Sequence, residues 1–363
     1  MYDVVIVRYG EIFLKGEPVK KRFERQLIEN IKLKLKKKSL QGEILRERHR
    51  IYIQTDNAKK VADSLKSIFG IVSLSPAVET KADIGELGKV AADMAEEIID
   101  EGDTFAVRVK RTGRHGFSSK DVEEKLGDMI LDSINTRVDL SHPDKTIYVE
   151  VKDGQGFVFD EKIRGVGGLP YKTQGKVIAL ISGGVDSSVA AWMIMRRGCE
   201  ITALHFGSTD EVEEIIEKLQ EYSVHRIKTY TIPYDEILGA ISEKAEKYTC
   251  IVCKRMMYKI ADRIKEIEDA HGIVTGESMG QVASQTLENL EILSEVTSPI
   301  YRPLIGMDKQ EIIERAKEIG AYELSVDKKC VYLPAKPSTK ANPDKIREIE
   351  KTIDFEIDKW ITR

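Results

Sequence analysis

Two small groups of residues in this chain have the types and spacing that chemistry requires. The first is the turn "SGGVDSS" (182–188), which stands between the apolar stretches "KVIALI" and "VAAWMIM". The second is a set of three cysteines, with Cys250 and Cys253 in "TCIVC" and Cys330 further along the chain. Glycine-rich turns of this kind bind phosphate groups, whereas clustered cysteines hold metals or carry sulfur. The two groups predict a phosphate-binding site and a metal, redox or sulfur-carrying site.

The glycine-rich turn is predicted to join a buried strand to a helix. Backbone N–H groups and the positive end of the helix dipole meet at such a turn, so it forms an anion site. Gly183 and Gly184 let the backbone approach a phosphate closely, and the serine hydroxyls add donors. The lysine that a "GxxxxGK[ST]" P-loop requires is absent. Asp186 would repel phosphate unless a cation bridged them, so it is predicted to recruit Mg²⁺.

The cysteines permit three interpretations. Cys250 and Cys253 lie one helical turn apart, and the basic "KR" that follows them should favour thiolates. A structural zinc site would need a fourth ligand, and no second Cys or His pair is visible. A redox or persulfide pair with Cys330 as sulfur carrier is one alternative, and an iron–sulfur cluster with one open position is another. Cys199 is predicted to be a buried structural residue.

The elements that must position these residues fall into three regions. Strands and helices alternate as β-α-β-α-β at the start of the chain, and further α+β elements follow, ending in a hairpin around "DGQG". After the glycine-rich stretch "RGVGGLPYKTQG", short apolar strands alternate with helices, including a long helix through "TCIVC". This alternation predicts a doubly wound parallel sheet, whose ligands bind at the carboxyl ends of the strands. The predicted domains are 1–75, 76–165 and 176–363, with a linker at 166–175.

The charge and the apolar content of the chain indicate which partners and which location to expect. The 363 residues carry a net charge of −4, but residues 1–60 have 16 Lys and Arg against 8 Asp and Glu. A basic first domain favours a polyanionic partner, although "IKLKLKKK" would equally suit a solvated helix face. No apolar run is long enough to span a bilayer and no signal peptide is visible, so the predicted location is the cytoplasm.

The motifs together resemble one family. "SGGVDSS" is similar to the pyrophosphate-binding loop of the ATP pyrophosphatases. "RYGEIFLKG", "GVGGLP", "TGESMGQVASQTLENL" and "RPLIGMDKQEII" extend the likeness to the tRNA 4-thiouridine synthetases of the ThiI type. The resemblance implies an N-terminal ferredoxin-like domain, a THUMP domain and an ATP pyrophosphatase domain. It also implies a homodimer that uses ATP to convert uridine 8 of tRNA to 4-thiouridine by adenylating its O4, with thiamin thiazole synthesis as a second role.

The resemblance also assigns the site residues. Asp186 and the three cysteines would be catalytic. Only 33 residues follow Cys330, too few for the rhodanese domain of many bacterial relatives. An iron–sulfur cluster on Cys250, Cys253 and Cys330 is therefore favoured over a persulfide pair, with sulfide or a cysteine desulfurase persulfide as donor. The implied ATP pocket comprises Leu180, Ile181, Ser182, Gly183, Gly184, Asp186, Ser187, His205, Phe206, Lys254, Gly276 and Gln285.

The resemblance places RNA contacts in the second domain. The basic stretch "VRVKRTGRHGFSSK" would follow the phosphates of a tRNA acceptor stem and position it without reading sequence. Two alternatives stay open: an ATP-dependent amidating enzyme that shares the loop, and a THUMP protein that binds RNA without catalysis. Release of pyrophosphate that depends on tRNA would separate them. The predicted RNA-binding residues are Arg108, Lys110, Arg111, Arg114 and Lys120.

Overall fold

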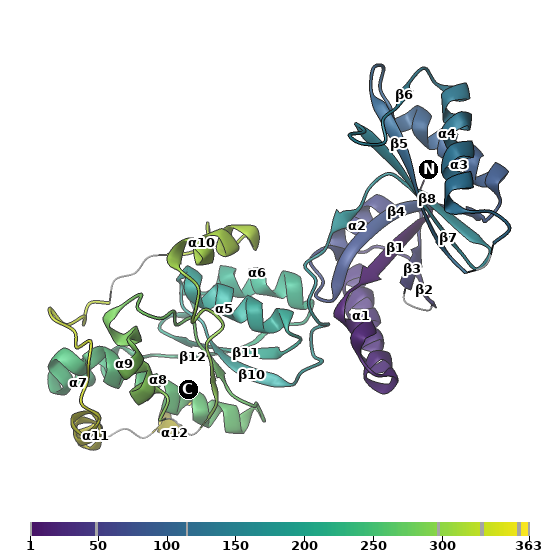
Figure 1. Cartoon of the computed structure of the whole chain (residues 1–363). Helices are drawn as coiled ribbons and strands as arrows, with labels where there is room; N and C mark the ends of the chain where they lie inside the picture. Colours follow the sequence, from purple (N-terminus) through teal and green to yellow (C-terminus); the bar gives the residue numbers. More distant parts are fainter. Residues whose placement is uncertain are drawn as a thin grey trace. The chain divides into compact units, whose positions relative to one another are not determined.

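The chain divides into two compact units, residues 1–168 and 169–363 (Figure 1). The computed structural model describes residues 2–47, 50–113, 115–295, 298–326, 330–353 and 357–361. No helix among these residues has both the length and the apolar character that crossing a membrane would require.

The first unit is an α+β structure built on one sheet. Its strands follow the order β2-β3-β1-β4-β8-β7-β5-β6, and β9 pairs with β4 beside this path. The hairpin predicted around "DGQG" is formed by β7 and β8. The elements are β1 (Val4–Tyr9), η1 (Glu11–Leu14), α1 (Glu17–Lys37), β2 (Glu43–Glu47), β3 (Arg50–Gln54), α2 (Ala58–Leu65), β4 (Ile71–Lys81), α3 (Ile84–Ile98), β5 (Thr104–Thr112), α4 (Ser119–Ser133), β6 (Arg137–Val138), β7 (Lys145–Lys152), β8 (Gln155–Phe159) and β9 (Ile163–Arg164).

Strand β4 joins the first two predicted domains into one sheet. Its first half pairs with β1, and its second half pairs with β8. The predicted boundary at residue 75 therefore falls inside an 11-residue strand. Because a strand of this length can hydrogen-bond to different partners along its course, two sheets fuse without a break in the ladder.

The two faces of this sheet differ. Val78 and Val158, which pair across β4 and β8, belong to the core that α3 and α4 cover. Their neighbours Ala77 and Phe157 point to the opposite face, where they join a separate cluster with Val4, Ile6, Tyr52 and Phe159. No residue of α1 to α4 belongs to that second cluster within the described part of the chain. The unit therefore has a helix face and a face without helices, here called the open face, on which each residue of the second cluster is no more than 3% exposed.

The stretch predicted as a linker contains no helix or strand but is anchored at both ends. Gly167 donates its N–H to the carbonyl of Ile71 at 2.7 Å, within the first unit. Leu169 donates to the carbonyl of Arg196 at 2.9 Å, within the second. Tyr171 is buried and its hydroxyl accepts a hydrogen bond from the N–H of Ile201. The change from one unit to the other thus falls between Gly168 and Leu169.

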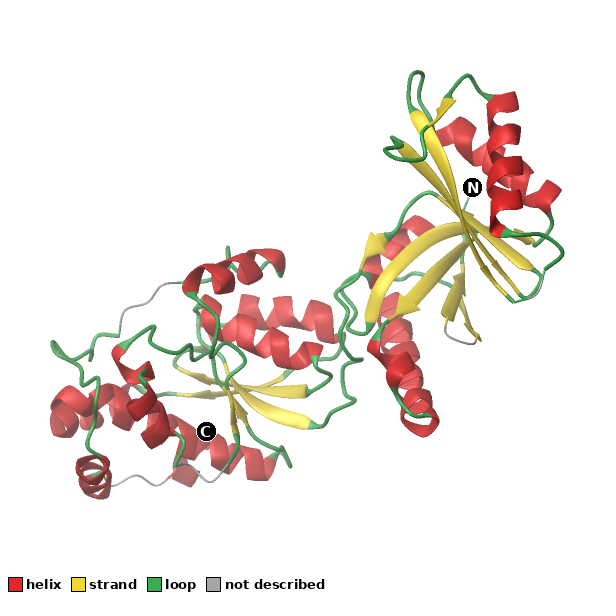
Figure 2. Cartoon of the chain, viewed as in Figure 1, coloured by secondary structure: helices red, strands yellow, loops and turns green. Residues whose placement is uncertain are grey.

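The second unit is the doubly wound sheet that the sequence predicts. Its five strands are parallel in the order β12-β11-β10-β13-β14, and helices lie on both faces (Figure 2). The elements are β10 (Lys176–Leu180), α5 (Val185–Arg196), β11 (Glu200–Phe206), η2 (Thr209–Glu211), α6 (Glu213–Ser223), β12 (Lys228–Ile232), α7 (Asp235–Ala245), η3 (Glu246–Tyr248), α8 (Thr249–Ile267), β13 (Ile273–Val274), η4 (Ala283–Gln285), α9 (Leu287–Leu293), β14 (Ile300–Tyr301), α10 (Lys309–Glu318), α11 (Pro343–Thr352) and α12 (Ile357–Ile361).

One prediction for this unit is wrong. The long helix expected through "TCIVC" is broken at Glu246, whose φ of 46° lies in the left-handed region. The break separates α7 from α8 and lets both pack on the same face of the sheet, against Ile178, Leu204 and Ile232. As a result α8 begins just before the first cysteine of the pair.

Candidate active site

The glycine-rich turn connects β10 to α5, as predicted. Gly184 caps the helix without a side-chain hydrogen bond of its own, and its N–H is 3.4 Å from the Ser182 hydroxyl. Ser187 closes the turn, because its hydroxyl accepts the N–H of Ser182 at 3.0 Å and lies 3.1 Å from the Ser182 hydroxyl. The serines therefore shape the loop from within, while the helix terminus faces outward as an anion site.

Gly276 brings the end of β13 against this turn. A Cβ at this position would lie 2.7 Å from both the Asp186 carbonyl carbon and the Ser187 nitrogen. Real Cβ atoms do not approach backbone that closely, so glycine is required here. The close approach aligns the carboxyl ends of β10 and β13 around one space.

That space is a cavity of about 270 Å³ at the carboxyl ends of the strands. It is in the position where doubly wound sheets bind their ligands. Ten of the twelve residues predicted for the ATP pocket line it, and Gly183 and Gly184 do not. The sequence missed four further lining residues, Met257, Tyr258, Thr275 and Glu277. The ten predicted residues are Leu180, Ile181, Ser182, Asp186, Ser187, His205, Phe206, Lys254, Gly276 and Gln285.

The polar and aromatic side chains in the cavity wall indicate which kind of ligand it would bind. Gln285 is 7% exposed, and its Oε1 accepts no hydrogen bond from the described residues. The Nδ1 of His205 is 2.9 Å from the carbonyl of Ile181, which fixes the ring beside the turn. Phe206 meets Tyr234 edge to face, with ring centroids 4.9 Å apart. An aromatic wall with an unsatisfied amide oxygen suits a ligand with a flat ring and N–H donors.

Asp186 has two partners that the sequence did not identify. One carboxylate oxygen accepts from Lys309 Nζ at 2.7 Å, and the other accepts from Gln281 Nε2 at 2.8 Å. Lys309 is the first residue of α10, whose start is fixed by a capping box between Asp308 and Glu311. Both partners lie in motifs that carried the family resemblance, which was the available signal. Lys309 supplies the site with the cation that the turn itself lacks.

The three cysteines come together beside this cavity. Cys250 and Cys253 lie on α8, next to the cavity-lining Lys254. Cys330 is exposed, and it is close enough to raise the pKa of both other thiols electrostatically. The basic neighbour Lys254 does act in favour of the thiolates, as expected, but burial outweighs it. Burial raises the pKa of Cys253 to about 12 and also raises that of Cys250, and the charge of Lys254 only partly offsets it.

Two further predictions concern a metal site and Cys199. Within the described residues, no group of three or more His, Cys, Asp or Glu side chains is arranged to hold a metal ion. Cys199 is half-buried, and burial raises the pKa of its thiol. It does not line the cavity.

The predicted RNA-binding residues separate between the two faces of the first unit. Arg108 and Lys110 alternate with Val107 and Val109, which pack toward α3 and α4, so the two cations point to the open face. Arg111 lies on the same side of the strand as Val109, so it points to the helix face. Lys120 lies on α4 and pairs with Glu124. Arg114 lies outside the described residues.

The open face combines aromatic rings with cations. Tyr52 stacks on Phe157 with ring centroids 4.7 Å apart, and Tyr148 stacks on Phe159 at 5.3 Å. Arg8 lies over Phe159, and the Nζ of Lys162 is 3.6 Å from the centroid of the Tyr148 ring. Further cations on this face are Arg50, Lys110 and Lys152, which line a cavity of about 220 Å³ around Glu150.

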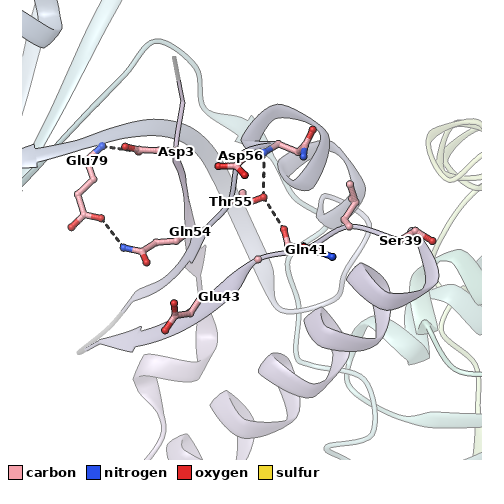
Figure 3. Close-up of a pocket in the computed structure, with 11 residues that line it drawn as sticks. Asp3, Ser39, Gln41, Glu43, Gln54, Thr55, Asp56 and Glu79 are labelled. Carbon is pink, nitrogen blue, oxygen red and sulfur yellow. Dashed lines mark hydrogen bonds between the residues drawn. The ribbon is translucent and has the colours of Figure 1, made fainter.

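A larger cavity, of about 640 Å³, lies elsewhere in the first unit (Figure 3). Its lining includes four carboxylates and no lysine or arginine, so it would repel phosphate. Figure 3 shows that the lining groups bond to one another: Asp3 accepts the Glu79 N–H, and Gln54 donates to the Glu79 carboxylate. Size alone therefore does not mark the active site. The four carboxylates belong to Asp3, Glu43, Asp56 and Glu79.

The fold and the site define a nucleotide-binding α/β unit joined to an α+β unit with a basic, aromatic open face. Comparison with known proteins is more specific. A family model described as thiamine biosynthesis protein (ThiI) matches residues 172–355, a ThiI ferredoxin-like domain matches 4–75, and a THUMP domain matches 81–159. The chain belongs to the ThiI family.

Relatives are similar in sequence to this chain over nearly its whole length. A probable tRNA sulfurtransferase of Methanobrevibacter smithii is 42% identical, over 96% of this chain and 94% of its own. One from Methanocaldococcus jannaschii is 40% identical, over 96% and 97%. The crystal structure of a 4-thiouridine synthetase–RNA complex with bound ATP superposes with a TM-score of 0.87 at 34% identity, over 97% of this chain and 95% of that one.

Proposed function

We propose that the protein is an ATP-dependent tRNA sulfurtransferase that forms 4-thiouridine at position 8. The observation that carries this proposal is the convergence at one cavity of the phosphate-binding turn, Lys254 and the cysteines that flank it. Relatives named as tRNA sulfurtransferases and the RNA- and ATP-bound structure of a 4-thiouridine synthetase support it.

The first half-reaction uses the turn and its cations. The triphosphate of ATP lies along residues 182–187, where helix N–H groups and the ammonium groups of Lys254 and Lys309 stabilise the charge that develops on the α-phosphate. The uracil O4 attacks the α-phosphorus, an O–P bond forms, and pyrophosphate leaves. Asp186 has the carboxylate oxygens that would hold a Mg²⁺ ion, which would further offset phosphate charge. In the absence of nucleotide, Asp186 holds Lys309 in place.

The second half-reaction uses the cysteines. A sulfide-level sulfur attacks C4 of the adenylated uracil, a C–S bond forms, and the C–O bond breaks to release AMP. Cys250, Cys253 and Cys330 supply thiol donors of the type that an iron–sulfur cluster requires, and such a cluster would present an exchangeable sulfide beside the cavity. Burial keeps Cys253 protonated in the metal-free protein, so cluster binding would displace protons. The sulfur donor is sulfide, or a cysteine desulfurase persulfide from which two thiols release sulfide as they are oxidised to a disulfide. The assembly is a homodimer.

The open face of the first unit is the RNA-binding surface in this proposal. Closely spaced cations are the groups that proteins use to hold phosphates. The rings of Tyr52, Phe157 and Phe159 are buried, so they support this surface from within the sheet and do not stack on bases. Partial desolvation and then the charge of Arg8 lower the pKa of Lys162, so an anionic ligand would relieve repulsion on this face. Arg108 and Lys110 keep the role predicted from the sequence, while Arg111 and Lys120 point away from this surface.

Removing two cations from the open face should weaken tRNA binding in a salt-dependent way. For Lys110→Ala combined with Lys162→Ala, we expect about a tenfold loss of affinity near physiological salt, and a slope of log K against log salt that is shallower by about one to two. Filter binding at several salt concentrations measures both. Lys89→Ala, on the exposed side of α3, should change neither. An unchanged slope in the double variant would exclude this face as the phosphate contact.

The test of the function itself is the product of a reaction with tRNA, ATP and sulfide. An amidating enzyme would release pyrophosphate but leave no sulfur in the RNA. A non-catalytic RNA-binding protein would release no pyrophosphate. The thiolation reaction predicts both 4-thiouridine and tRNA-dependent pyrophosphate.

A further inference from the structure

Glu277 is a buried carboxylate in the wall of a cavity built for phosphate. Its residue is 4% exposed, and it directly follows Gly276, whose backbone abuts the start of α5. With Asp186 it is one of two carboxylates in the lining. A negative charge there opposes the binding of a polyanion, so its presence needs a physical reason.

The contacts of Glu277 supply that reason. Its Oε1 accepts from Lys254 Nζ at 3.0 Å. Its Oε2 accepts from Arg302 Nε at 2.7 Å and from the Thr275 hydroxyl at 3.3 Å. Two cations therefore share one anion, and the group of three keeps one excess positive charge. Arg302 comes from the loop after β14, so the carboxylate ties together α8 and the ends of two strands.

The balance of burial and charge keeps Glu277 ionised. Burial alone would raise the pKa of its carboxyl group, but Lys254 and Arg302 together hold it below its usual value. Its two cation partners differ in surroundings. Arg302 and its Nε contact are largely buried, whereas the Lys254 side chain is 24% exposed and reaches the cavity.

The Lys254 side chain needs a contact that restricts its rotamers. Its side chain has four rotatable carbon–carbon bonds, and a lysine at a cavity mouth is free to sample many rotamers unless a contact selects one. The ion pair with Glu277 selects the rotamer that points its ammonium into the cavity. Arg302, fixed by burial, in turn restricts Glu277.

We propose that Glu277 is a positioning residue, which holds the Lys254 ammonium where the nucleotide phosphates bind. Glu277 touches no reacting atom and acts through Lys254. This inference depends on the proposed function for one point, which is that the bound nucleotide is ATP. It assigns Arg302 as the group that anchors the carboxylate.

A double-variant cycle tests this role. Lys254→Met and Glu277→Gln should each weaken ATP binding about tenfold, because each removes one charged contact or the group that orients it. If Glu277 acts through Lys254, adding Glu277→Gln to Lys254→Met should weaken binding by no more than about twofold further. Equilibrium titration with ATP measures the four dissociation constants without tRNA. The rate of tRNA-dependent AMP formation, measured on the same proteins, should show the same coupling.

Glu268→Gln is the matched control. Glu268 is a half-buried carboxylate, bound by Lys176, Lys228 and Tyr230, and it does not line the cavity. This variant should lose thermal stability yet bind ATP within about twofold of the parent. If Glu277→Gln lowers the folded fraction, Glu277→Asp, which keeps the charge but shortens the reach, replaces it in the same cycle.

Two outcomes would overturn the proposal. One is independent losses, with the double variant about 100-fold weaker than the parent. The other is unchanged ATP binding in folded Glu277→Gln. If the binding cycle shows coupling but no AMP forms in the presence of tRNA, the positioning role holds and the proposed function fails.

Discussion

Gly276→Ala is expected to weaken ATP binding by about 100-fold. The added Cβ would meet the backbone of Asp186 and Ser187 at 2.7 Å, and backbone cannot rotate away as a flexible side chain can. Overpacking of this kind costs about 1–3 kcal/mol, and here the strain falls on the turn that binds phosphate. Equilibrium titration with ATP and thermal unfolding measure the loss of affinity and of stability.

Gly306→Ala is the control for this substitution. It lies in the same unit, a Cβ there would meet nothing within 4 Å, and its φ is not in the left-handed region. It should bind ATP normally. If Gly276→Ala also bound ATP with the parent affinity, the turn would not be the phosphate site.

Cys330→Ser should separate the two half-reactions. We expect 4-thiouridine formation to fall by about 1,000-fold or more, because a hydroxyl cannot replace a thiol as sulfur carrier or cluster ligand. ATP binding should be unchanged, since Cys330 does not line the cavity. Mercury-affinity electrophoresis of the tRNA product measures thionation, and ATP titration measures binding.

Cys199→Ser provides the comparison, since Cys199 is half-buried away from the cavity. It should keep thionation within about threefold of the parent. Thionation at the parent rate by Cys330→Ser would remove that residue from the sulfur path. It would leave Cys250 and Cys253 as the whole sulfur site.

Much of the second unit could be predicted from local patterns. The order of apolar strands and helices specified a parallel sheet, and the carboxyl ends of parallel strands necessarily meet at one edge. Residues far apart in sequence, such as Ser182 and Gln285, could therefore be assigned to one cavity. The family motifs supplied the individual residues.

The features that were missed depend on tertiary contacts. Lys309 reaches Asp186 from 123 positions away in the sequence, and no local pattern encodes that distance. Burial likewise outweighs the basic neighbours of Cys250 and Cys253, and burial depends on what packs over α8. The fusion of the first two domains through β4 was missed because a strand's pairing partners cannot be read from its own residues.

The central claim is that one cavity activates a tRNA base with ATP and then receives sulfur. The most direct measurement is a stoichiometric assay, in which anaerobically purified protein is incubated with unmodified tRNA, ATP and sulfide. Pyrophosphate, AMP and 4-thiouridine are then quantified. We predict one pyrophosphate and one AMP for each 4-thiouridine, located at position 8. Absence of thionated uridine under conditions where the protein binds both ATP and tRNA would contradict the account.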